Sequence, residues 1–245
     1  MKEYFEKAVL HPLPPGRTAA ELTMRGREMA NFRTDDFTNI YYEDAGAGPA
    51  MVFLHGWTGN HCAWAPAVRH FTQKGYRVIT YDHRGHGASG LPPRGYTMER
   101  LARDLEGLMA YLDLKDVILC GLSMGAHVLF AYARLFGCAR LSKAITMDMS
   151  PKLIADETWP HGLYKGSVTQ QDNLDILHAM EADLSGFWRD FFTKVAAADP
   201  ISPEVTQALV EGVLNFPLHV AKALGNEIVR EEYRKTVSAI PVLTP

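Results

Sequence analysis

The residues whose types and spacing point most directly to chemistry lie in segment 121–125, which reads GLSMG. This segment fits Gly-x-Ser-x-Gly, a pattern that marks a nucleophilic serine when it joins a strand to a helix. The apolar run 117–120 predicts a short buried strand before it, and segment 126–135 predicts a helix after it. Ser123 is therefore predicted to lie on a sharp, strained turn, where glycine neighbours avoid steric collision.

The same turn would also provide a binding site for an oxyanion. The backbone N–H of Met124, at the start of the predicted helix, would point toward an oxyanion formed beside Ser123. The pentapeptide alone is also compatible with an ordinary serine in a strand-to-helix turn. Its interpretation therefore depends on the elements around it.

Those elements alternate between short apolar strands and amphipathic helices. Such alternation predicts an α/β fold with a mainly parallel sheet and helices on both faces. In sheets of this kind the site lies beyond the carboxyl ends of the strands. Strands are predicted at 38–44, 50–54, 77–81, 117–120 and 143–147, and helices at 62–73 and from the N-cap Thr97 to Leu112. Four polar residues directly follow predicted strands and should converge at one edge: His55, Asp82, Ser123 and Asp148.

The remaining segments have a different pattern. A connecting helix is predicted near 19–31. Segment 151–235 shows no clear strand, and it predicts a helical cap over the site, with helices at 173–180, 184–198, 202–214 and 218–233. Strand character returns at 239–243. The predicted organisation is an α/β core over 1–150, a cap over 151–235 and the start of a returning core strand over 236–245.

Composition narrows the class of protein. The chain of 245 residues, with 47% hydrophobic and 22% charged residues, suits one globular α/β domain with an insertion. A net charge of −3 with scattered Lys and Arg argues against nucleic-acid binding, and no apolar stretch approaches the ~20 residues of a membrane span. The widely spaced Cys62, Cys120 and Cys138 argue against a metal cluster and for a reducing compartment. Without a visible signal peptide, we expect a cytoplasmic protein.

Four segments together carry a family resemblance: 55–59 (HGWTG), 82–89 (DHRGHGAS), 121–125 (GLSMG) and 148–151 (DMSP), which precedes the predicted cap. With them the chain resembles the α/β-hydrolase fold superfamily, in its esterase, haloperoxidase and proline iminopeptidase-like branch. The resemblance implies that the substrate is a small carboxylic ester or a related acyl compound. It implies no metal and no organic cofactor.

The resemblance also implies roles for individual residues. Ser123 is the implied nucleophile, and the backbone N–H groups of Trp57 and Met124 are the implied oxyanion hole. His55 would brace its loop rather than act as a base. Arg84 would either form an ion pair or touch the substrate.

One part of the family pattern is missing. In the family, the acid and then the histidine follow the strand predicted near Ile240, but no histidine follows His219, which falls in the predicted cap. A serine needs a base within hydrogen-bonding reach. His127, on the predicted helix after Ser123, and His161, in the cap, are the alternative bases.

Asp148 is the alternative acid, because it follows the strand after Ser123, a position that a minority of the superfamily uses. The competing interpretation is that Asp148 only caps the chain as it enters Pro151. Without a histidine, an acid would have no base to orient.

Three hypotheses remain open at this point. The first is a serine hydrolase that works through an acyl-serine intermediate, of which this chain is a C-terminally incomplete version. The second is a complete protein that has lost its triad and acts as a binding or structural relative. The third is a cofactor-free haloperoxidase or perhydrolase that uses the same serine. A serine at position 123 disfavours dehalogenase and epoxide hydrolase chemistry, in which the family has an aspartate there. The identity of the substrate and the oligomeric state stay open.

Overall fold

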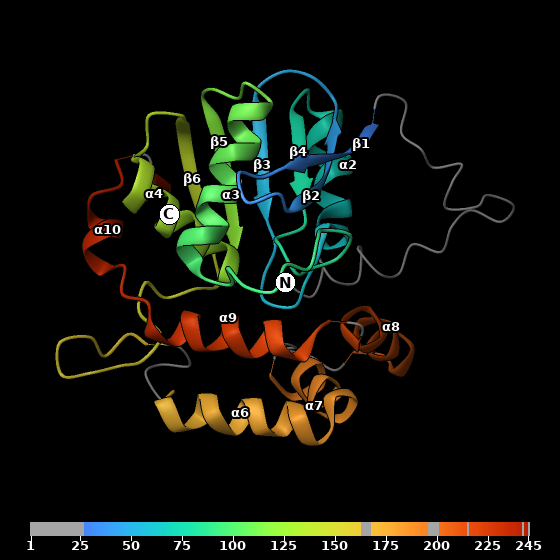
Figure 1. The fold of residues 1–245 in the computed structure, drawn as a ribbon, viewed down its shortest axis with the longest axis vertical. Helices are drawn as coiled ribbons and strands as arrows, with labels where there is room; N and C mark the ends of the chain where they lie inside the picture. The colour runs from blue at the N-terminus through green and yellow to red at the C-terminus, as the bar shows by residue number, and fades with distance from the viewer. Residues whose placement is uncertain (1–26, 163–167, 196–200, 215, 242, 245) are drawn as a thin grey trace, which may run out of the picture.

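The structure is a computed structural model that describes residues 27–162, 168–195, 201–214, 216–241 and 243–244. A seven-stranded sheet forms its centre, in the order β1-β2-β4-β3-β5-β6-β7 (Figure 1). Pairing is parallel from β4 through β3, β5 and β6 to β7, and antiparallel at β1 and β2. The predicted α/β fold with a mainly parallel sheet is confirmed. The strands are β1 Arg27–Arg33, β2 Asn39–Ala45, β3 Ala50–Leu54, β4 Arg77–Tyr81, β5 Val117–Leu122, β6 Leu141–Met147 and β7 Leu243–Thr244.

Helices cover both faces of this sheet. This arrangement explains why the central strand β3 is apolar at every position. Alternate side chains of a strand point to opposite faces. Val52 and Leu54 pack with helices α3 (Met98–Tyr111) and α4 (Met124–Phe136), whereas Met51 and Phe53 pack with the short helix η2 (His61–Trp64) and helix α2 (Ala65–Gln73). Every position of β3 is therefore buried, as expected for a strand covered on both faces.

A group of four helices, which we call the helical layer, lies beyond one end of the sheet (Figure 1). It comprises α6 Gln170–Ala182, α7 Leu184–Asp190 with its continuation η3 Phe191–Val195, α8 Pro203–Leu214 and α9 Leu218–Arg230. A third hydrophobic cluster, beside those on the two faces of the sheet, joins these helices through Leu177, Met180, Trp188, Val210 and Ala221. The helices predicted for this region are confirmed over the described residues, with residues 196–198 of the predicted helix 184–198 lying outside them. The status of this region as a separate domain stays a prediction. No helix within the described ranges is both long and apolar enough to cross a bilayer.

One predicted element is wrong, and one begins later than predicted. Residues 27–31 lie in β1 and not in a connecting helix, because the segment pairs with β2 and turns Ala30 and Phe32 toward the core; residues 19–26 lie outside the described ranges. The returning strand predicted at 239–243 begins later than expected: helix α10 (Arg234–Ser238) precedes this segment, residues 239–241 are not in a strand, residue 242 lies outside the described ranges, and β7 begins at Leu243. Pro241 has no N–H to donate to a ladder, which disfavours a strand at that position.

Candidate active site

Ser123 lies at the junction between β5 and α4, as predicted. Its backbone has φ 51° and ψ −120°, a conformation that strains any residue other than glycine. Its N–H donates to the carbonyl oxygen of Met147 on the neighbouring strand at 2.9 Å, which holds the turn against the sheet. The side chain is half-buried, so it is accessible to a small molecule.

The glycines on either side of Ser123 are required by close backbone contacts. A Cβ atom at position 121 would lie 2.5 Å from the carbonyl oxygen of Gly125. A Cβ atom at position 125 would lie 2.3 Å from the carbonyl oxygen of Leu54, at the end of β3. The turn therefore packs against the strand that leads into the HGWTG segment, and only hydrogen atoms fit at these two positions.

Gly125→Ala is expected to destabilise the fold by about 2–3 kcal/mol, because the added methyl group overlaps backbone that cannot move without disturbing β3. Gly212→Ala is the matched control, since Gly212 lies inside α8 and a methyl group added there would have nothing within 4 Å. That control should stabilise the protein by up to about 1 kcal/mol through helix propensity. Urea unfolding of both variants checks the pair. Equal stabilities for the two variants would contradict the packing argument.

The loop after β3 lies directly against Ser123. A Cβ atom at Gly56 would be 3.4 Å from the Cβ of Ser123. Thr58 has a positive φ of 60°, and its hydroxyl donates to the carbonyl oxygen of Trp57 at 2.7 Å, which fixes the next peptide of the loop. Within the described ranges, neither the N–H of Trp57 nor that of Met124 donates to a protein acceptor. Both donors predicted for an oxyanion hole are therefore free to bind an oxygen.

His55 supports this loop from beneath. Its ring is fully buried, and its Nδ1–H donates to the carbonyl oxygen of Gly56 at 2.8 Å while its Nε2 accepts from the N–H of His83 at 3.0 Å. Burial lowers the pKa of His55 to about 4, so the ring is neutral at physiological pH. These contacts agree with the bracing role predicted for His55.

The side chain of Trp57 joins the loop to the helical layer. Its indole N–H donates to the carbonyl oxygen of Ala221 on α9 at 3.1 Å. A Cβ atom at Gly225, one helical turn further, would lie 3.2 Å from the indole, and the ring of Trp188 on α7 lies 6.0 Å away. Sequence reasoning assigned Trp57 a role only through its backbone. No local pattern connects two residues that are 164 positions apart.

Asp148 lies beside Ser123 at the edge of the sheet. The strands β5 and β6 pair Leu122 with Met147, so the next residue on each strand is Ser123 and Asp148. Asp148 is exposed and has a positive φ of 53°. Its role as the acid stays a prediction, because the structure shows it near the site but not in contact with any histidine that lies in the described ranges.

The structure argues against His127 as the base. Its ring is fully buried, and its Nε2–H donates to the carbonyl oxygen of Ser150 at 2.9 Å. The ring of Tyr233 packs against it with centroids 5.2 Å apart. Burial lowers the pKa of His127 to about 4. His127 is a packed structural side chain, as its position on the buried helix α4 dictates.

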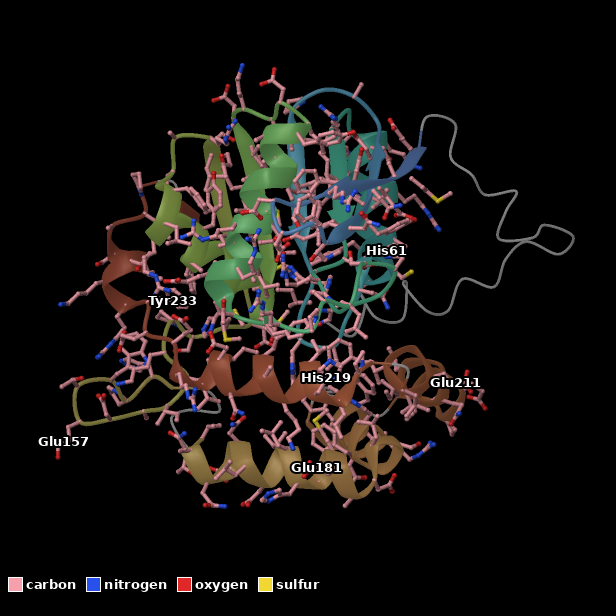
Figure 2. The ribbon with its side chains drawn as sticks, viewed as in Figure 1. His61, Glu157, Glu181, Glu211, His219 and Tyr233 are labelled. Atoms are coloured by element: carbon pink, nitrogen blue, oxygen red, sulfur yellow. The ribbon has the colours of Figure 1, made fainter. Side chains whose placement is uncertain are left out.

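The other two histidines considered do not contact the nucleophile. His161 is exposed and packs edge-on against Trp159, with ring centroids 5.2 Å apart. His219 lies on α9, where Figure 2 shows it on the helix that faces the sheet, and its ring is 6.1 Å from that of Tyr96. Among the described residues, no side chain lies within hydrogen-bonding distance of Ser123 Oγ. No residue in the described part of the chain is therefore identified as the general base for Ser123.

Arg84, in the glycine-rich loop after β4, is committed to ion pairs. Its side chain is fully buried between Asp104 on α3, at 2.6 Å, and Asp36 in the β1–β2 connection, at 2.8 Å. Arg100 adds a second cation to Asp104 at 2.7 Å. Of the two roles expected for Arg84, the structure supports the ion pair, because its guanidinium is hydrogen-bonded to both carboxylates beneath the loop.

Comparison with known proteins agrees with this geometry. Residues 49–200 match the family described as the alpha/beta hydrolase fold. The non-heme chloroperoxidase CPO-A1 of Kitasatospora aureofaciens is 34% identical over 176 residues, which are 71% of this chain and 62% of that protein, so the chain spans less than two thirds of that relative. Two solved structures share the fold. One is an esterase from Exiguobacterium antarcticum, with a TM-score of 0.81 and 25% identity over 88% of this chain and 78% of that chain. The other is a bromoperoxidase from Bacillus anthracis, with a TM-score of 0.80 and 26% identity over 88% of this chain and 79% of that chain. The chain belongs to the α/β-hydrolase fold family.

Proposed function

We propose that this protein is a serine hydrolase that cleaves a small carboxylic ester, or a related acyl bond, through an acyl-serine intermediate. One observation carries the proposal. A strained, accessible Ser123 lies against a loop whose Trp57 N–H has no protein acceptor within the described ranges, and the N–H of Met124 beside it has none there either. A nucleophile next to two unpaired backbone donors is the arrangement that acyl transfer requires.

In the proposed reaction, Ser123 Oγ attacks the carbonyl carbon of the ester and gives up its proton to a base. The N–H groups of Trp57 and Met124 donate to the carbonyl oxygen as it becomes an anion, and losing one such donor typically lowers the rate by about 10² to 10³. The alcohol leaves with a proton, and water then releases the acid from Ser123. Asp148 is the proposed acid that orients the base, on the strength of its place beside Ser123.

The proposal is tested by treating the folded 245-residue chain with a fluorophosphonate and mapping the adduct by peptide mass spectrometry. We expect one adduct, on Ser123, and none after the chain is unfolded in urea, because attack depends on the folded turn. A folded chain without an adduct would contradict a complete hydrolytic site in this chain. If such an unreactive chain bound small esters saturably, it would support the second hypothesis, a binding relative.

A second candidate function is halogenation through a peracid made at the same serine. It is favoured by the likeness to the chloroperoxidase of Kitasatospora aureofaciens and to the bromoperoxidase of Bacillus anthracis. In this reaction hydrogen peroxide replaces water in releasing the acyl group from Ser123, so the product is a peracid. Bromination of a phenolic dye that needs acetate, peroxide and Ser123 together would support it. Bromination without acetate would argue against it.

A further inference from the structure

A second group of reactive side chains lies outside the candidate active site, at the start of η2. Figure 2 shows His61 beside the sheet and outside the helical layer. Its Nδ1 lies 2.9 Å from both carboxylate oxygens of Asp82, and its Nε2 lies 3.4 Å from Cys62 Sγ. Cys62 is exposed. A thiol, an imidazole and a carboxylate in this order form the arrangement that activates a cysteine nucleophile.

The Asp82 carboxylate is fixed in place by its own loop. It accepts hydrogen bonds from the backbone N–H groups of His61 at 2.6 Å and Ala88 at 2.8 Å. A Cβ atom at Gly87 would lie 2.1 Å from it, so the chain closes tightly around the carboxylate. Burial opposes ionisation, but the hydrogen bonds and the nearby histidines outweigh burial and lower the pKa of Asp82. The group facing His61 is therefore an anion.

His61 is held in its protonated form by its surroundings. Burial alone would lower the pKa of His61, but hydrogen bonds to Asp82 and Cys62 outweigh it and raise the pKa to about 9. Glu43 on β2 also faces the ring, 3.6 Å from Nε2, and the ring of Tyr41 lies 4.8 Å away. With Nδ1–H bonded to Asp82, the proton on Nε2 is directed at the sulfur of Cys62.

The other two cysteines provide an internal reference. Cys120 on β5 is buried, and burial raises its pKa to about 12. Cys138, after α4, is partly exposed, and burial raises its pKa as well. Neither has a histidine or a carboxylate as a hydrogen-bond partner within the described ranges. Cys62 is thus distinguished from both by exposure and by an imidazole N–H directed at its sulfur.

We propose that Cys62 is a site of oxidation by hydroperoxides, with His61 and Asp82 as the groups that activate it. The sulfur attacks one oxygen of hydrogen peroxide, so that an S–O bond forms and the O–O bond breaks. Sulfur is oxidised by two electrons to a sulfenic acid, and the second oxygen leaves as water after taking the proton from His61 Nε2. The proton of the thiol returns the imidazole to its charged form, so the net change converts thiol and peroxide into sulfenic acid and water.

The test measures the oxidation rate of each cysteine in the full chain. The protein is treated with hydrogen peroxide at about pH 7 in the presence of dimedone, which traps sulfenic acid, and labelled peptides are counted by mass spectrometry over time. We expect Cys62 to react at least about tenfold faster than Cys138. As the pH rises through about 9, His61 loses its proton and this advantage should shrink.

Three variants make the result specific. His61→Gln should lower the Cys62 rate to that of Cys138, whereas His70→Gln, on the exposed face of α2, should leave it unchanged. Ser123→Ala should also leave it unchanged, which separates this site from the proposed hydrolase. Continued protection of the buried Cys120 shows that each variant is folded. Equal rates at Cys62 and Cys138 in the unchanged protein, or an undiminished Cys62 rate in a folded His61→Gln variant, would overturn the proposal.

Discussion

Replacing Ser123 by glycine is expected to abolish the fluorophosphonate adduct and to give a more stable protein than Ser123→Ala by about 1 kcal/mol. Both variants lack the nucleophilic oxygen, so both should lose acyl transfer completely. They differ because alanine keeps a Cβ at φ 51° and ψ −120°, where only glycine is unstrained. The effect on stability therefore reports the strain in the turn independently of the chemistry.

The measurement combines labelling with urea unfolding of the unchanged protein and the two variants. Retention of an adduct in either variant would show that another residue is the nucleophile. Equal unfolding free energies for the glycine and alanine variants would show that the turn is not strained at this position. Labelling tests the nucleophile and unfolding tests the backbone strain, so each result can be interpreted without the other.

Arg84→Met is expected to lower the free energy of unfolding by about 3–5 kcal/mol. The substitution keeps a long apolar stem but removes the cation between Asp104 and Asp36, and the carboxylate of Asp104 is 1% exposed. When the buried Asp104 carboxylate loses Arg84, no water can reach it to take the place of the guanidinium. Arg100 still keeps one contact with Asp104. The loop that carries Arg84 should also lose its attachment to α3 and to the β1–β2 connection.

Arg77→Met is the matched control, because Arg77 forms a comparable bidentate contact with Asp44 but is 30% exposed. Water can replace its partner, so we expect a loss of about 1 kcal/mol or less. Adding Asp104→Leu to Arg84→Met should recover part of the stability, since the unpaired buried charge is then gone. Thermal unfolding of the four proteins checks the series. An equal loss for Arg84→Met and Arg77→Met would contradict the role of burial.

The ion pairs of Arg84 should also affect how the stability of the protein changes at acid pH. Hydrogen bonds from Arg84 lead the contributions that lower the pKa of Asp36. A carboxyl group with a lowered folded pKa stabilises the fold above its ordinary pKa, near 4, and this contribution is lost as the pH falls toward the folded value. Arg84→Met removes the main cause of the shift. The acid dependence of stability between about pH 5 and pH 2 should therefore be shallower in the variant.

Much of the core could be predicted from sequence because its signals are local. The apolar run of β3, the N-cap Thr97 and the GLSMG turn each depend on residues that are close neighbours in the chain, and each element appears where it was expected. The strand β1 was missed because its formation depends on pairing with β2, a contact between separate segments. Tertiary pairing overrides weak local preference at such an edge.

The candidate site divides in the same way. Ser123, Met124 and Trp57 could be identified from two short motifs, and the structure brings those motifs together. His127 could not be rejected from sequence, because the acceptor that engages it, the Ser150 carbonyl, lies 23 positions further along. The His61–Asp82 contact was missed for the same reason, since it joins η2 to the end of β4.

The contact between Trp57 and Ala221 is a polar link between the loop after β3 and α9, a helix whose Val220, Leu224 and Ile228 also pack into the main core. One residue supplies both a backbone donor beside Ser123 and an indole bonded to α9. The helical layer cannot swing away from the sheet as a rigid body without breaking that hydrogen bond and separating the indole from Trp188. A displacement of α9 is therefore coupled to the Trp57 side chain and, through it, to the loop that carries the Trp57 backbone N–H.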